Sequence, residues 1–289
     1  MFVPPFVRSL PFVVAISVIA LYAGLMGTAV SAERRSELVR YDNVQIEVVV
    51  EGEGAAVVLL PSLARDSDDY DQVAEGLAAT GFRVLRPKPR GIGRSIGPMA
   101  NITLHDFARD IAEVIERLGK GHAVIVGHAY GNWVARMTAA DHPNLVRGVV
   151  IAAAAAKQYA PELTTAVTNA GNLSLSNEER LAALRFAFFA PGNDPTVWLH
   201  GWHPEIRNSQ RAAVAAVRQD EWWSGGTAPL LDLQAELDPF KPEAKRNEMK
   251  DEFGERVTVM VIPNASHSLI PEQPKAVVEA LTTWIKGLP

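Results

Sequence analysis

The 289-residue sequence contains no cysteine and has no excess of positive charge. Without cysteine the chain can form no disulfide, no thiolate nucleophile and no metal site with cysteine ligands, and its redox compartment cannot be inferred. The formal net charge of −5 gives no basic surface of the kind that binds nucleic acid, so we expect no nucleic-acid partner. The composition, 48% hydrophobic and 21% charged, is typical of a globular protein.

Charge is also lacking near the N-terminus, where no charged residue occurs between Arg8 and Glu33. Residues 10–30 are almost wholly apolar, and small residues follow at a plausible cleavage point after Ala32. We interpret residues 1–32 as a signal peptide and expect export, to the periplasm or the medium. The alternative is an uncleaved anchor formed by residues 10–30, which are numerous enough to span a bilayer. Contact with a membrane is expected only through this segment.

The third feature that the sequence lacks is a serine hydroxyl at one particular turn. An apolar run at residues 123–126 leads into Gly127-His-Ala-Tyr-Gly131, and the spacing of apolar residues after it predicts a helix. This is the pattern of a nucleophile elbow, G-x-S-x-G, in which a serine lies on a sharp turn between a strand and a helix. Ala129 stands at the serine position. A plain strand–loop–helix connection with two glycines is the alternative interpretation.

Strands and helices are predicted to alternate along most of the chain after residue 36. We therefore expect an α/β fold, a mostly parallel sheet with helices on both faces, built from residues 36–156 and 227–289. The alternation stops between residues 157 and 226, where the sequence is predicted to be helical and is rich in aromatic residues. We interpret this segment as an inserted helical lid.

Asp238 and His267 each follow a predicted strand, at residues 230–235 and 257–262. Open α/β sheets bind ligands at this end of their strands. The order of elbow, acid and histidine, with a helical insertion between the elbow region and the acid, resembles the α/β-hydrolase family. The resemblance covers residues 36–288, and Arg90-Gly-Ile-Gly-Arg-Ser95 is similar to the family's Arg-Gly-x-Gly-x-Ser loop.

The resemblance implies a role for each of five residues. Ala129 takes the nucleophile position, His267 is the general base, and Asp238 orients the histidine. The backbone N–H groups of Leu63 and Tyr130 are implied to form an oxyanion hole. It also implies the fold of the family, and no cofactor or metal is expected.

The sequence departs from the family before Leu63, where Pro61-Ser62 replaces His-Gly. Candidate residues of the substrate pocket are Ser62, His128, Trp198 and Trp202. Three serines were considered as replacement nucleophiles, but none lies in an elbow and each is interpreted as a turn residue: Ser62, Ser95 and Ser266. Asp238 precedes a proline, so it can alternatively cap the helix that follows. His200 and His203 have a spacing that suits a metal, and packing within the lid is the favoured interpretation.

Three functions are compatible with an elbow that has no serine. The first is an enzyme in which a His267–Asp238 dyad and the oxyanion hole act without a covalent nucleophile on a small, partly apolar ester, lactone or related carbonyl compound. The second is a ligand-binding protein that has lost turnover. The third is a serine hydrolase whose serine has been replaced by alanine. Loss of the serine costs an optimised serine enzyme about a millionfold in rate, which excludes a serine mechanism for this chain.

Overall fold

The computed structural model describes residues 1–2 and 34–289. The predicted leader, residues 1–32, lies outside the described part apart from its first two residues. Among the described residues, no helix is both long and apolar enough to cross a bilayer.

An eight-stranded sheet forms the centre of residues 34–289, in the order β1-β2-β4-β3-β5-β6-β7-β8. Strand β2 runs antiparallel to both β1 and β4, and every other neighbouring pair is parallel. The strands are β1 (Arg35–Tyr41), β2 (Val44–Glu51), β3 (Ala55–Leu60), β4 (Phe82–Pro87), β5 (Ala123–His128), β6 (Val146–Ala152), β7 (Leu230–Ala235) and β8 (Val257–Ile262). The order of connection reverses at β3, which lies between β4 and β5, so ligands are expected beyond the carboxyl end of β3.

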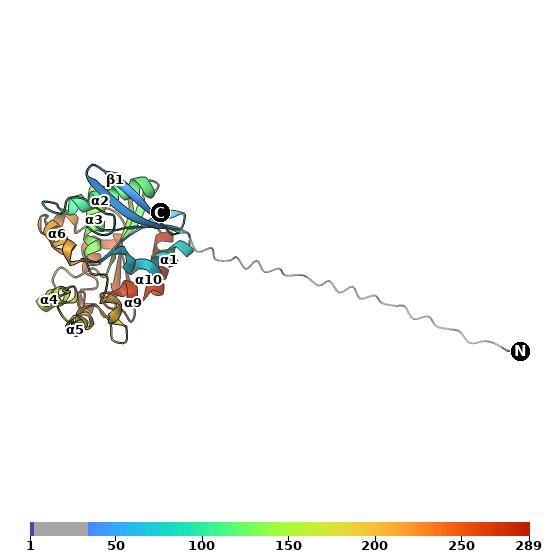
Figure 1. The fold of residues 1–289 in the computed structure, drawn as a ribbon. Helices are drawn as coiled ribbons and strands as arrows, with labels where there is room; N and C mark the ends of the chain where they lie inside the picture. Colours follow the sequence, from blue (N-terminus) through green and yellow to red (C-terminus); the bar gives the residue numbers. More distant parts are fainter. Residues whose placement is uncertain (3–33) are drawn as a thin grey trace. The chain divides into compact units, whose positions relative to one another are not determined.

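Helices cover both faces of this sheet (Figure 1). Helices α1 and α10 pack together with one face, and α2 and α3 pack together on the other. The longer helices are α1 (Asp71–Ala79), α2 (Leu104–Leu118), α3 (Tyr130–Asp141), α4 (Pro161–Ala170), α5 (Asn177–Ala187), α6 (Pro204–Ala215) and α10 (Pro274–Lys286). The short ones are α7 (Gln219–Trp222), α8 (Glu248–Phe253), α9 (Leu269–Glu272) and the 3₁₀ turns η1 (Ser67–Tyr70), η2 (Pro143–Leu145), η3 (Pro195–Trp198), η4 (Glu243–Lys245) and η5 (Gly254–Arg256).

The continuous apolar strands are explained by burial on both faces. In β3, Val57 and Leu59 join the apolar cluster under α1 and α10, whereas Val58 and Leu60 join the cluster under α2 and α3. Successive side chains of a strand point to opposite faces, so a strand that is covered on both sides needs apolar residues throughout. The predicted fold class, a mostly parallel α/β sheet with helices on both faces, is confirmed.

The helical segments near the C-terminus are interrupted. The 3₁₀ turn η4 ends at Lys245, and α8 starts only at Glu248. Helix α9 ends at Glu272, and α10 starts at Pro274 after a break at Gln273. Proline has no N–H and fits best in the first turn of a helix, so it starts α10 rather than continuing α9.

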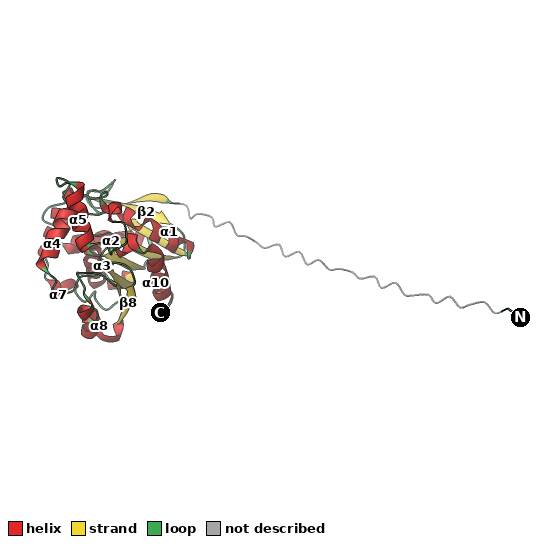
Figure 2. Ribbon diagram, turned by 90° about the horizontal axis from the view of Figure 1, so that it is seen from below, coloured by secondary structure: helices red, strands yellow, loops and turns green. Residues whose placement is uncertain are grey.

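The segment between β6 and β7 contains helices α4 to α7, and α4 and α5 lie side by side in both views (Figures 1 and 2). It has an apolar cluster of its own, which includes Leu163, Leu184, Phe188, Trp198 and Trp202. Leu63, from the loop after β3, packs against this cluster. The insertion is thus joined by apolar contacts to the carboxyl edge of the sheet.

Candidate active site

The turn between β5 and α3 has the strained backbone of a nucleophile elbow. Ala129 has φ 47° and ψ −111°, a conformation that residues with a side chain rarely adopt. Its N–H donates to the carbonyl of Ala152 at 2.9 Å, and its carbonyl accepts the N–H of Asn132 at 3.1 Å. The turn therefore has the geometry of the G-x-S-x-G pattern while its central side chain is a methyl group.

The two glycines of this turn are required by close backbone contacts. A Cβ atom on Gly127 would lie 2.3 Å from the carbonyl oxygen of Gly131. One on Gly131 would lie 2.4 Å from the carbonyl oxygen of Leu60, at the end of β3. Both distances are shorter than real Cβ contacts, so only glycine lets α3 pass this close to the two strands.

His267 and Asp238 meet beside Ala129, although they come from different loops. The Nδ1 atom of His267 lies 3.0 Å from Oδ2 and 3.2 Å from Oδ1 of Asp238. Both residues are buried, with 5% and 4% of their surface exposed. The alternative, an Asp238 that caps a following helix, is not what the structure shows: no helix starts there, and Oδ1 of Asp238 accepts the N–H of Phe240 within a turn at 2.9 Å. A carboxylate on Nδ1 leaves Nε2 as the nitrogen available to a substrate.

The ring of His267 is held in place from two further sides. The ring of Phe240 lies against it, with centroids 4.2 Å apart. The backbone carbonyl of His267 accepts a hydrogen bond from Nε2 of His128 at 2.7 Å. Burial, and then the nearby His267, lower the pKa of His128 to about 3, so His128 stays neutral and serves as a donor. The imidazole that faces the site is thus oriented by a carboxylate, an aromatic ring and a backbone hydrogen bond.

The backbone N–H groups of Leu63 and Tyr130 lie at the same edge of the sheet, after β3 and β5. Within residues 34–289, neither group donates to an acceptor in the turns, loops or side chains around it. Both residues line a cavity with Ala129 and His267. Two donors without protein acceptors beside an imidazole are able to bind a carbonyl oxygen that gains negative charge.

The loop that carries Leu63 is fixed by the insertion. The N–H of Ala64, a residue with φ 57°, donates to Oε1 of Gln210 on α6 at 2.8 Å. The carbonyl of Ala64 accepts the N–H of His203 at 2.9 Å. Arg65 donates to the carbonyl of His200 at 2.5 Å. These three bonds determine the path of the loop where the family's His-Gly is replaced by Pro61-Ser62.

A cavity of about 300 Å³ joins these groups. Its polar and charged lining comprises Ser62, Tyr130, Asn132, Tyr159, Thr164, Arg211 and His267, and the remainder includes Leu63, Trp133, Val167, Phe188, Val214 and Phe240. The volume is at the lower end of the range for ligand pockets, and the mixture of apolar walls with few polar groups is typical of them.

Of the four pocket residues that the sequence suggests, only Ser62 lines this cavity. The prediction for Trp198 and Trp202 is corrected: both are buried behind it, in the insertion's own apolar cluster. The guanidinium carbon of Arg65 lies 4.5 Å and 4.9 Å from their ring centroids. The prediction for His128 is also corrected, because this residue is wholly buried under the histidine loop.

The other candidate nucleophiles and ligands lie elsewhere in the structure. The hydroxyl of Ser95 donates to the carbonyl of Lys88, and that of Ser266 donates to the carbonyl of Leu237. His203 contacts Glu205, its Nδ1 lying 3.0 Å from Oε1. Among the described residues, no group of three or more His, Cys, Asp or Glu side chains is placed to hold a metal ion.

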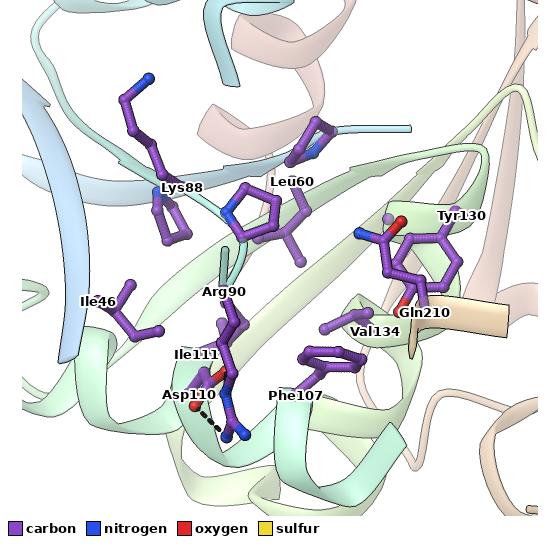
Figure 3. A pocket seen from close by; sticks show the side chains of 14 residues that line it. Ile46, Leu60, Lys88, Arg90, Phe107, Asp110, Ile111, Tyr130, Val134 and Gln210 are labelled. Atoms are coloured by element: carbon purple, nitrogen blue, oxygen red, sulfur yellow. Dashed lines mark hydrogen bonds and ion pairs between the residues drawn. The ribbon is translucent and has the colours of Figure 1, made fainter. Parts of the chain in front are cut away.

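A second cavity, of about 50 Å³, lies beneath the elbow (Figure 3). Arg90 and Asp110 form an ion pair on its wall, with Nε–Oδ2 2.8 Å. Tyr130 and Gln210 also line it, and Tyr130 lines the larger cavity as well. The space is too small for an organic substrate.

Three residues of the site were not found from the sequence: Gln210, Arg211 and Phe240. Gln210 and Arg211 are far in sequence from the residues that they contact or accompany, and none of the three belongs to a short motif. The only available signal was the position of Phe240, two residues after Asp238.

Known proteins share this fold and parts of this sequence. The family model described as alpha/beta hydrolase fold matches residues 55–190. A 2-(acetamidomethylene)succinate hydrolase of Mesorhizobium japonicum is 23% identical over 86% of this chain and 95% of its own length. A non-heme chloroperoxidase of Streptomyces lividans is 27% identical over 82% of this chain and 85% of its own.

Solved structures of other proteins have the same fold. The crystal structure of E-2-(acetamidomethylene)succinate hydrolase superimposes with a TM-score of 0.73 at 22% identity, over 88% of this chain and all of the other. An esterase from Rhodococcus sp. superimposes with a TM-score of 0.69 at 25% identity, over 89% and 99% of the two chains. Sheet order, elbow geometry, family model and relatives of similar length agree, and the chain belongs to the α/β-hydrolase family.

Proposed function

We propose that this protein is an enzyme that acts on a small, partly apolar ester, lactone or related carbonyl compound through a His267–Asp238 dyad, without a covalent nucleophile. The observation that carries the proposal is the 3.0 Å contact of His267 with Asp238 at a cavity shared with Ala129, Leu63 and Tyr130. Relatives named as hydrolases and esterases support the reaction class.

In the proposed reaction, Nε2 of His267 accepts a proton from a water molecule as its oxygen attacks the carbonyl carbon of the substrate. The N–H groups of Leu63 and Tyr130 stabilise the oxyanion that forms. When the carbonyl re-forms, the bond to the leaving oxygen breaks and His267 returns the proton to it. The products are an acid and an alcohol, and Asp238 stabilises the imidazolium between the two transfers.

Ala129 fits this scheme because its methyl group occupies the place of a nucleophile without reacting. The adjoining backbone remains in the elbow conformation, so the Tyr130 N–H keeps its place beside the cavity. We also propose that the protein is exported, with residues 1–32 as its leader, and that residues 157–226 act as a helical lid over the cavity.

The experiment compares wild type with His267→Ala on a panel of p-nitrophenyl esters and lactones. We expect His267→Ala to abolish turnover and to leave ligand affinity within about tenfold, because the imidazole acts on the transition state more than on the ground state. His122→Ala, at an exposed histidine on the loop before β5, is the matched control and should keep full activity. Equal binding by both forms with no turnover by either would favour a ligand-binding protein instead.

Restoring the hydroxyl with Ala129→Ser tests the oxyanion hole separately. We expect esterase activity to appear or to rise sharply, because the acid, the base and the turn are already in position. A burst of p-nitrophenol and an acyl-enzyme mass would be the signature. If no acyl-enzyme forms, the two N–H groups do not serve as an oxyanion hole for that ester.

A further inference from the structure

The charge that lines the large cavity has one sign. Arg211 is the only Arg or Lys among its lining residues, and no Asp or Glu is among them. Asp238 lies behind His267 and is not part of the wall. A bound molecule therefore meets one permanent positive charge and no negative charge.

Arg211 keeps its charge free for a ligand. It is exposed, and within residues 34–289 its side chain takes part in no ion pair or hydrogen bond. Arg207 lies one turn earlier on α6 and donates to Oγ1 of Thr168 at 2.7 Å. Burial and the charge of Arg211 lower the pKa of Arg207, which is the effect of two like charges on one side of a helix. An anion in the cavity would relieve this repulsion.

Other polar groups of the wall fit an anionic ligand. Tyr159 and Thr164 both line the cavity, and each carries a hydroxyl able to donate a hydrogen bond. A guanidinium group binds a carboxylate through two parallel N–H···O bonds. One cation neutralises one carboxylate, whereas a phosphate monoester would retain uncompensated charge against the apolar part of the wall.

We propose that Arg211 binds a carboxylate of the substrate, so that the substrate is a carbonyl compound with a free carboxylate at one end and its reacting group at His267. This inference rests on the proposed function for the identity of the reacting group. The carboxylate end is recognised by α6 of the insertion, and the reacting end is held at the carboxyl edge of the sheet.

The test measures binding, so that it does not depend on turnover. Monomethyl adipate and dimethyl adipate have the same chain length and differ in one carboxylate. Both are titrated calorimetrically into the full chain, with His267→Ala present throughout so that neither ester is hydrolysed. We expect the chain with Arg211 unchanged to bind the monoester at least tenfold more tightly than the diester. Arg211→Gln should weaken the monoester by about tenfold to a hundredfold, as expected for loss of a charge-assisted pair, and change the diester by less than twofold.

Two variants complete the experiment. Arg211→Lys should keep part of the preference, since the charge remains but the two-pronged geometry is lost. Arg207→Gln, the neighbouring arginine that does not line the cavity, should change the preference by less than threefold. Equal weakening of both esters in Arg211→Gln would mean a packing role and overturn the proposal, as would a lack of preference with Arg211 unchanged.

Failure of this inference is distinguishable from failure of the dyad mechanism. Turnover of dimethyl adipate that His267→Ala abolishes, together with equal affinity for both esters, would support the dyad and overturn the carboxylate. Preferential binding of the monoester that Arg211→Gln removes, with no turnover, would support the carboxylate and count against the dyad.

Discussion

The two turns that flank the cavity are held by different kinds of contact. The elbow after β5 is fixed locally, by its own glycines and by the strands on either side of it. The loop after β3 lacks the family's His-Gly and is fixed from the insertion, through the side chain of Gln210, the N–H of His203 and the carbonyl of His200. The backbone conformation of the elbow therefore does not require a serine at position 129. The conformation of the loop after β3, in contrast, depends on contacts with a segment more than a hundred residues away.

The largest effect is expected from a methyl group inside the elbow. In Gly131→Ala the added Cβ would meet the carbonyl oxygens of Leu60 and Pro61 at 2.4 and 2.7 Å, and backbone atoms cannot yield as a flexible side chain can. We expect the free energy of unfolding to fall by about 3 kcal/mol or more.

Chemical denaturation measures this loss, and Gly287→Ala is its control. The Cβ of that variant would come no closer than 3.4 Å to its nearest neighbour, and its φ of −84° suits any residue. Equal stability of Gly131→Ala and wild type would show that the elbow is not fixed by close contact.

A smaller effect is expected at the loop. Gln210→Ala leaves the buried N–H of Ala64 without its acceptor, which costs about 1–3 kcal/mol of stability. In an Ala129→Ser background the same change should lower kcat with little effect on KM, because Gln210 positions the loop of Leu63 and does not touch the substrate cavity.

Hydrogen exchange at Ala64 and steady-state kinetics measure the two effects of Gln210→Ala. The control is Gln219→Ala, at an exposed position of α7. Equal losses of kcat in both variants, or a rise in KM alone, would contradict a positioning role for Gln210.

The smallest expected effect is a gain of stability at the elbow itself. Ala129 has a positive φ that glycine adopts without steric cost, so Ala129→Gly should raise the free energy of unfolding by about 1 kcal/mol. Ala212→Gly, at an exposed position within α6, should lower it by about the same amount, since glycine is unfavourable inside a helix. Thermal unfolding of the two variants gives the signs, and a loss in both would argue that the elbow carries no strain.

The sequence predicts those parts of the structure that are determined by residues close together in the chain. The apolar strands, the two glycines of the elbow and the positions of Asp238 and His267 after their strands all follow from short patterns, and the structure brings these elements to one edge. Aromatic character, in contrast, did not identify the residues that line the pocket. Trp198 and Trp202 form the core of the insertion, because an aromatic side chain suits a buried cluster as well as a binding site.

The contacts of Gln210 and Arg211 could not be predicted, since a glutamine or an arginine on an amphipathic helix is most often exposed to solvent. Their function depends on which side of α6 faces the loop after β3. That orientation is set by contacts distant in sequence, since Ala213 and Val214 of α6 pack with the apolar cluster under α2 and α3 and Gln210 binds the Ala64 N–H.

The bond between Ala64 and Gln210 also has a consequence for the order in which the molecule matures. A ribosome synthesises the chain from its N-terminus, so the elbow is complete long before residue 210 exists, and the acid and the histidine follow later still. A nascent chain that ends before α6 has its sharp turn but no acceptor for the Ala64 N–H. The loop of Leu63 therefore gains its bond to Gln210 only after α6 has been synthesised, and the dyad forms only after residue 267, so an unfinished polypeptide carries no working centre.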